Sequence, residues 1–200
     1  MHNPDPFRQP DAAKLRAFIR EHPFATLVSA AEEGPFVSHI PLYLNERGEA
    51  LVGHVARGNG HWRLAGAKSL AIFHGPHAYI SASWYGMPDV VPTWNYLAVH
   101  VRGTLAALDA EETSRVLDRM IVEHEPDPAA FRARLGESIR AGLERGISGV
   151  KLAIESWEGK WKLSQNKDAE TRARLSDRLA EQAGEDAQRI ARLMRESDRP

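Results

Sequence analysis

The stretch that decides the fold is "FATLVSAAEEGPFVSHIPLYLNERGEALVGHVA", residues 24–56. Its apolar and β-branched runs are separated by "EEGP" and "NERGE", two clusters of turn-forming residues, so it predicts three strands joined by short turns. Pro41 has no amide hydrogen for a sheet ladder, so the second strand is expected at an edge of the sheet or at a bulge. Strands at such short spacing favour an antiparallel barrel.

Hydrophobic periodicity and turn residues predict further strands and helices on both sides of this stretch. The predicted segments are helix 11–23, strands 24–30, 36–44, 50–56, 69–75, 75–86 and 93–108, helices 109–124 and 128–145, strand 147–164, and a helical tail from Asp168 interrupted near Gly184. We expect one domain, mainly β with peripheral helices. An antiparallel barrel over about 24–108 plus 147–161 would carry a helical insert, 109–145, and a helical tail, 168–196.

One predicted strand, "GPHAYISASWYG" (75–86), has two chemically different faces. Ala78, Ile80, Ala82 and Trp84 alternate on one side and suit a core, and the other side carries His77, Tyr79, Ser81 and Ser83. This polar row is either a hydrated sheet face or a surface that meets a ligand or a partner.

Composition excludes several classes of function. Lys and Arg number 26 against 27 Asp and Glu, for a net charge of −1, so no basic field attracts nucleic acid. Without cysteine, disulfides, thiolate metal sites and cysteine nucleophiles are excluded. No apolar run is long enough to span a bilayer. A cytoplasmic protein is therefore expected, with no membrane partner.

Motifs for several kinds of catalysis are also missing. The nine histidines include no HExxH pair, so a dedicated metal site is not favoured over ordinary hydrogen-bonded histidines. There is no GxSxG elbow and no GxGxxG or Walker lysine. Aromatic and amide side chains instead gather at predicted strand ends, at Trp62, Trp84, Tyr85, Trp94 and Asn95. They could hold a planar ligand, with "RGNGHWR" (57–63) for a phosphate, although strand tryptophans are more often core residues.

Four ordered motifs resemble a known family. "GHVARGNGHWR" (53–63), "FHGPHAYISASWYG" (73–86), "VPTWNYLAVHVRG" (91–103) and "KLSQNK" (162–167) are similar to those of the PaiB family of FMN-binding negative transcriptional regulators. The resemblance covers about residues 7–178. It implies an antiparallel split β-barrel of the FMN-binding type, a homodimer, and FMN at the subunit interface.

The resemblance also implies where the flavin binds. By position in related split barrels, the phosphate would meet Ser38, His39, His54, Asn59, His61 and Trp62. Trp94 and Asn95 join them as part of the aromatic and amide set, and Lys162, Ser164, Gln165 and Asn166 as a late donor set, unless that last group simply caps the following helix. Related oxidases carry arginine and lysine where this chain has histidine, serine and asparagine. We therefore expect modest FMN affinity that rises as the pH falls and the histidines gain protons.

Two functions remain open at this point. The family resemblance implies a negative transcriptional regulator, and the fold implies, as the alternative, a flavin-dependent oxidoreductase acting on a small molecule or a nicotinamide cofactor. Direct DNA binding has weak support, because no helix-turn-helix signature is present and the tail from Asp168 mixes both signs of charge. Any DNA binding should be weak and lost at physiological salt.

Overall fold

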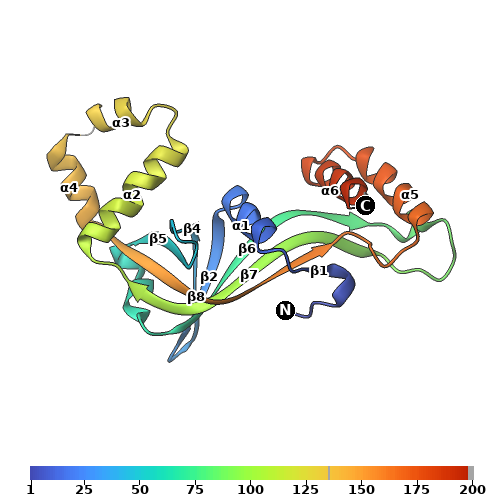
Figure 1. Cartoon of the computed structure of the whole chain (residues 1–200), viewed down its shortest axis with the longest axis horizontal. Coiled ribbons are helices and arrows are strands. Elements are labelled where there is room, and N and C mark those ends of the chain that lie inside the picture. The colour runs from blue at the N-terminus through green and yellow to red at the C-terminus, as the bar shows by residue number, and fades with distance from the viewer. Residues whose placement is uncertain (135, 198–200) are drawn as a thin grey trace. The chain divides into compact units, whose positions relative to one another are not determined.

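A computed structural model describes residues 1–134 and 136–197 of the chain (Figure 1). These residues form two compact units. The central unit comprises residues 19–73 and 100–157, and the terminal unit comprises residues 1–18, 74–99 and those from 158 onward. Strands β6, β7 and β8 contribute residues to both units.

The helices and strands follow the predicted order closely. The strands are β1 (Arg8–Gln9), β2 (Phe24–Ala31), β3 (Gly34–Pro41), β4 (Tyr43–Leu44), β5 (Ala50–Ala56), β6 (Lys68–Ile80), β7 (Thr93–Ala107) and β8 (Ile147–Lys162). The α-helices are α1 (Ala12–Glu21), α2 (Ala110–His124), α3 (Pro128–Arg134), α4 (Glu137–Arg145), α5 (Ala169–Ala180) and α6 (Glu185–Glu196). Four 3₁₀ turns within the described residues are η1 (Asp5–Phe7), η2 (Arg57–Asn59), η3 (His61–Leu64) and η4 (Ala82–Tyr85).

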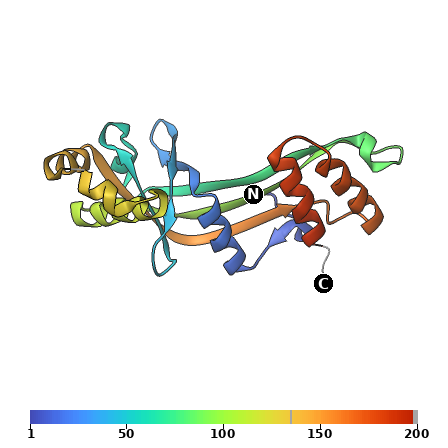
Figure 2. The same cartoon turned by 90° about the horizontal axis from the view of Figure 1, so that it is seen from above.

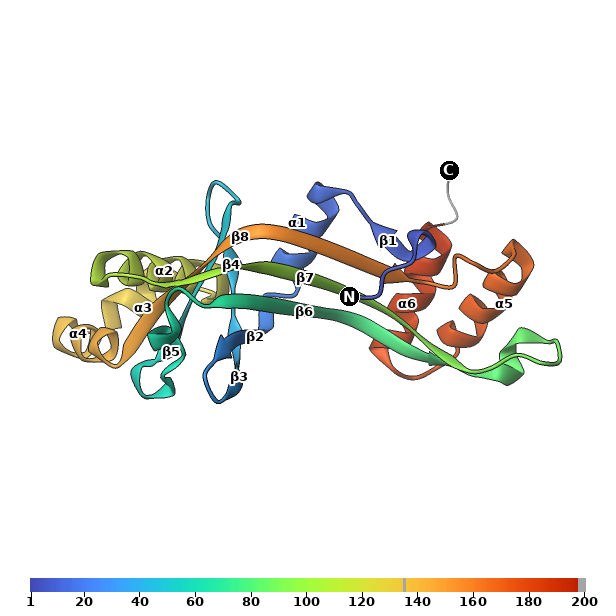
Figure 3. The ribbon, with the colours of Figure 1, turned by 90° about the horizontal axis from the view of Figure 1, so that it is seen from below.

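The sheet confirms the predicted fold class. Within the described part of the chain its order is β3-β2-β6-β7-β8-β5-β4, with β1 paired to β8. Pairs β2–β3, β2–β6, β4–β5, β5–β8 and β1–β8 are antiparallel, and the β2–β3 hairpin is visible in blue in Figure 3. The path is not closed, since β3 and β4 are its ends. Pro41 lies on β3, so its expected place on an edge strand is confirmed.

The central unit is built on strands covered by helix α2. Asp109 accepts a 2.8 Å bond from the Glu112 amide, and the Glu112 carboxylate accepts one from the Asp109 amide, which confirms the helix start suggested by these two residues. Val116 of α2 packs with Tyr43 and Val52 in a buried cluster. The predicted helix 128–145 is two helices, α3 and α4, and Gly136 is the N-cap of the second; position 135 lies outside the described residues.

The terminal unit contains a helical hairpin, the side-by-side red helices α5 and α6 in Figure 2. Their facing sides bury Leu175, Leu179, Ile190 and Met194. The predicted start at Asp168 is confirmed, because its side chain caps α5 by accepting from the Thr171 amide at 2.8 Å. Amphipathic packing therefore accounts for a tail whose other face is charged.

One predicted strand was too long. Strand β6 ends at Ile80, and Ser81 caps the 3₁₀ turn η4 by accepting a bond from the Ser83 amide. The reason is local, since a short hydroxyl side chain can satisfy a backbone donor that a sheet would otherwise use. Hence Ser81 and Ser83 do not continue the polar row of His77 and Tyr79, which lies on β6.

Candidate functional site

The central unit contains a buried hydrogen-bond chain around His61, which we call the His61 network. It consists of Ser29, Ser38, Asn59, His61 and Ser69. The His61 side chain is fully buried, and its ring meets the Ser29 hydroxyl at 2.7 Å through Nε2 and the Ser38 hydroxyl at 2.8 Å through Nδ1. Ser29 and Ser69 are joined at 2.5 Å. Strands β2, β3 and β6 are thus tied to the loop that carries His61.

The network makes His61 a structural anchor. Burial lowers the pKa of His61, so the ring is held neutral, with one nitrogen donating and the other accepting. Asn59 completes the arrangement, because its carbonyl oxygen accepts from the Ser38 hydroxyl at 3.2 Å and from the His61 amide at 3.1 Å. Both nitrogens of His61 are therefore engaged within the protein.

The loop that His61 anchors presents cations at its surface. Gly60 has φ +80°, a left-handed conformation that lets η2 turn directly into η3. The Trp62 ring then has the guanidinium groups of Arg57 and Arg63 at 5.9 and 5.3 Å from its centroid. The Trp62 indole donates to the Arg57 carbonyl at 3.0 Å, which fixes the ring. Arg57 and Arg63 are exposed, so this part of the loop presents two guanidinium groups, whose donor geometry suits an anionic ligand.

Two further histidines expected to bind FMN, His39 and His54, lie in surroundings different from those of His61. His39 is exposed on β3, with Nδ1 3.1 Å from the Thr26 hydroxyl. His54 is half-buried on β5 and lines a cavity between β5 and helices α2, α3 and α4, away from the His61 network. Burial lowers the pKa of His54 as well. Burial therefore opposes protonation of His54 and His61, the step on which the expected gain in FMN affinity at lower pH depends.

The remaining expected residues form a second cluster, in the terminal unit. Asn95 and Ser164 are buried and bonded to each other, with the Asn95 amide nitrogen 3.0 Å from the Ser164 hydroxyl. Lys162 donates to the Thr93 hydroxyl and, at 2.7 Å, to the Trp94 carbonyl. Burial, and then the neighbouring Lys160, lower the pKa of Lys162.

The rest of the "KLSQNK" segment is divided between scaffold and surface. The Gln165 side chain accepts from the Leu163 amide at 2.7 Å and donates to the Trp161 carbonyl at 2.5 Å. Asn166 is exposed, and Lys167 lies with Nζ 5.4 Å from the Tyr85 ring centroid. Most of this donor set therefore shapes its own loop and the start of β7.

The exposed arginines of the central loop belonged to the predicted phosphate segment but not to the predicted set of FMN-binding residues. "RGNGHWR" contains both arginines, and only its Asn59, His61 and Trp62 were in that set. A usable signal was the placement of Trp62 between two arginines in sequence, since guanidinium groups stack on indole rings.

The relatives of this chain show its family. The family profile described as "Putative FMN-binding domain" matches residues 1–156. "Protease synthase and sporulation protein PAI 2" of Bacillus subtilis (strain 168) is 33% identical over 200 residues, which cover 97% of this chain and 96% of that protein. The chain belongs to this FMN-binding family. The resemblance to the PaiB family is thus confirmed, and FMN is the cofactor that family membership supports.

Solved structures confirm the fold of this FMN-binding family member. The FAD and heme binding protein from Mycobacterium smegmatis has a TM-score of 0.63 at 19% identity, over 82% of this chain and 78% of that one. The flavocytochrome Anf3 from Azotobacter vinelandii has a TM-score of 0.65 at 13% identity, over 84% of this chain and 75% of that one. At such low identity the likeness establishes a shared architecture.

The donor set of the central loop fits the phosphate of FMN. A guanidinium group offers five N–H donors, and Arg57 engages one of its terminal nitrogens with the Ile147 carbonyl at 3.1 Å. The Asn59 oxygen is engaged by the His61 network, and its amide nitrogen is on an exposed side chain.

None of the helices in the described residues has the length and hydropathy needed to cross a membrane.

Proposed function

We propose that this protein is a homodimeric FMN-binding regulator of the PaiB type, and that Arg57 and Arg63 contact the FMN phosphate. The observation that carries this proposal is the loop formed by η2 and η3. This loop places two exposed guanidinium groups beside the Trp62 indole ring. The buried His61 holds the loop in this conformation. Charge-assisted bonds to phosphate are roughly twice as strong as neutral ones.

The other expected residues then divide into ligands and scaffold. Asn59, exposed on this loop, would add a donor to the phosphate, whereas the His39 side chain is exposed on the other face of β3, beside Thr26. Ser38 and His61 would hold the loop in shape, as their mutual 2.8 Å bond supports. FMN supplies one- and two-electron redox chemistry when bound, and the protein contributes its binding and orientation.

The homodimer is supported by an exposed aromatic surface on the terminal unit. The Tyr79 and Trp94 side chains are 47% and 52% exposed, and their rings meet edge to face at 5.8 Å. The His77 ring lies 6.0 Å from Trp94. Exposed aromatic patches of this kind mark association surfaces. Tyr85 does not belong to this surface, because its side chain is buried.

Regulation through a partner or a metabolite fits the charges better than direct DNA binding. On helix α5, Arg174 pairs with Glu170 at 3.0 Å and Arg178 with Glu181 at 3.1 Å. Arg195 of α6 reaches Asp177 of α5 at 2.8 Å. Arginines that are already paired with carboxylates contribute little to the binding of DNA phosphates.

The test is an equilibrium titration of the purified protein with FMN, followed by flavin fluorescence, together with light scattering. We expect saturable binding and a dimer mass, and a Trp94→Lys variant should shift the mass towards the monomer. Failure of FMN to bind at micromolar concentrations would contradict the proposal. Catalytic oxidation of NADH or NADPH by the flavin-loaded protein would favour an oxidoreductase instead.

A further inference from the structure

The central unit has a cavity whose lining does not include Arg57 or Arg63, the residues proposed to contact the FMN phosphate. It measures about 720 Å³ and is lined by α2, α3, α4 and the adjoining strands, within the range usual for small-molecule sites. Its apolar wall consists of Leu117, Ile121, Phe131, Leu143 and Ile147. Leu117 and Ile121 are half-buried and line this space.

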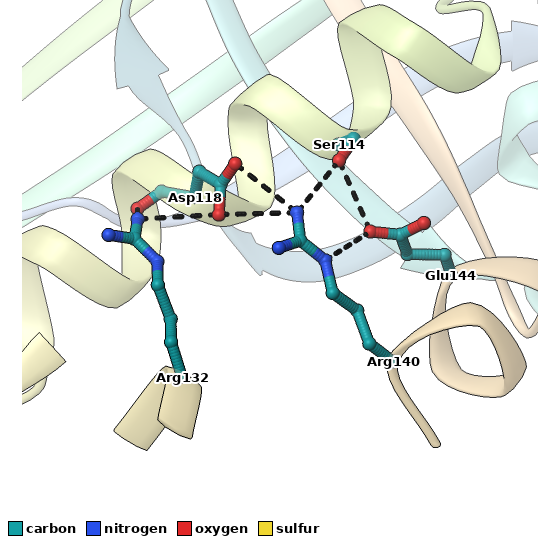
Figure 4. Close-up of polar contacts among 5 residues, drawn as sticks. All are labelled: Ser114, Asp118, Arg132, Arg140 and Glu144. Atoms are coloured by element: carbon teal, nitrogen blue, oxygen red, sulfur yellow. Dashed lines mark hydrogen bonds and ion pairs between the residues drawn. The ribbon is translucent and has the colours of Figure 1, made fainter. Parts of the chain in front are cut away.

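The cavity is also lined by a polar cluster, whose mutual contacts Figure 4 shows. Asp118 of α2 lies between two arginines, with its carboxylate 3.3 Å from Nη2 of Arg132 and 3.3 Å from Nη2 of Arg140. Arg140 also donates through Nε to Glu144 at 3.0 Å and through Nη2 to the Ser114 hydroxyl at 3.2 Å. Three helices therefore contribute charged side chains to one wall.

This cluster has more donors than acceptors. The contacts of Asp118 are long for charge-assisted bonds, which are typically about 2.7–2.9 Å. Within the described residues, the recorded contacts of Arg132 run through Nη2, and those of Arg140 through Nε and Nη2. A guanidinium has five N–H donors, so both arginines, which line the cavity, keep hydrogen-bonding capacity beyond these contacts.

His54 adds a further donor. Its Nδ1 is buried and has no hydrogen-bond partner among the described residues, while the ring lines the cavity. Because burial keeps the ring neutral, its single proton is better placed on Nε2 than on an unpaired buried nitrogen. Nε2 would then offer an N–H to a ligand in the cavity.

We propose that this cavity binds a small apolar monocarboxylate, aliphatic or aromatic. The carboxylate would accept bonds from Arg140 and Arg132, and the apolar body would lie against Leu117 and Phe131. A monoanion is favoured over a phosphate, because Asp118 and Glu144 remain in the cluster and repel a dianion more strongly. Such a ligand would bridge α2, α3 and α4, the helices of the predicted insert.

The experiment is isothermal titration calorimetry of the whole protein with 2-naphthoate and its uncharged analogue 2-naphthamide. We expect 2-naphthoate to bind at least tenfold more tightly than the amide, and Arg140→Gln to remove most of that difference. The matched control is Arg115→Gln, which is exposed on α2, pairs with Glu111 and does not line the cavity. It should leave the affinity within twofold of the original.

A second variant keeps the test valid if Arg140→Gln disturbs the helices. Ala141→Phe fills the cavity from α4 and retains every charge. It should weaken 2-naphthoate at least tenfold and leave FMN affinity within twofold. Equal affinity for acid and amide, absence of binding, or loss of FMN binding in Ala141→Phe would each overturn the proposal. Binding of 2-naphthoate by a protein that fails to bind FMN would refute the flavin proposal and leave this one standing.

Discussion

Replacing His61 with alanine should destabilise the protein severely, because the ring is buried and doubly hydrogen-bonded. Its two bonds to Ser29 and Ser38 contribute about 1 kcal/mol each. Removing the ring also leaves a cavity beneath Phe36, whose ring meets His61 at 5.0 Å, and this adds about 1–3 kcal/mol. Ser29 keeps its bond to Ser69, so little further cost arises from a stranded hydroxyl. The expected loss is about 3–5 kcal/mol.

Urea unfolding measures this loss as a lower midpoint at unchanged slope. The control is His39→Ala, since His39 is exposed and makes one bond, to Thr26. It should cost no more than about 0.5 kcal/mol. A loss below about 1 kcal/mol for His61→Ala would refute the anchoring role and would return His61 to the set of free phosphate ligands.

Three more predictions concern stability. Burial lowers the pKa of His54 and His61, so below the unfolded-state value of about 6.5 the unfolded chain binds protons that the folded one does not. Stability should therefore be highest above that pH and fall below it. The drop in urea midpoint from pH 7.5 to 5.5 should be smaller in His61→Ala than in the original protein. An equal drop in both would argue against a contribution from His61. Asp109→Ala removes the capping bond to Glu112 and should cost about 1 kcal/mol in urea unfolding, whereas Glu111→Ala, which loses a surface pair with Arg115, should cost about 0.5 kcal/mol or less. Gly103→Ala would place a Cβ 2.0 Å from the Ala153 carbonyl oxygen and should cost at least about 2 kcal/mol, while Gly142→Ala, with its nearest neighbour at 3.8 Å on a helix, should be neutral or stabilising in thermal melts.

Local patterns predicted most of the secondary structure correctly. The edge position of β3 followed from Pro41, and the starts of α2 and α5 followed from Asp109 and Asp168. These features depend on residues close in sequence, whose propensities and caps act locally. The end of β6 at Ile80 was missed, because Ser81 satisfies a backbone donor in a way that strand alternation does not reveal.

The site was predicted less completely, since burial depends on contacts distant in sequence. The sequence indicated a polar loop with Asn59 and His61, but it could not show that Ser29 bonds the His61 ring and Ser69 bonds Ser29. His54 alternates with Gly53 and Val55 on β5, and its face was decided by α2 packing over the strand. A shift of one residue moves a strand side chain to the other face of the sheet, and the spacing of histidines does not indicate which face each one occupies.

The most direct test of the central claim compares FMN with riboflavin, which lacks the phosphate, in the original protein and in Arg57→Gln/Arg63→Gln. Both titrations follow flavin fluorescence at about 0.15 M salt. We predict that FMN binds at least tenfold more tightly than riboflavin, and that the double variant loses most of this preference while riboflavin affinity stays within twofold. Equal affinity for the two flavins in the original protein, or an unchanged preference in the variant, would contradict the assignment of the phosphate to this loop.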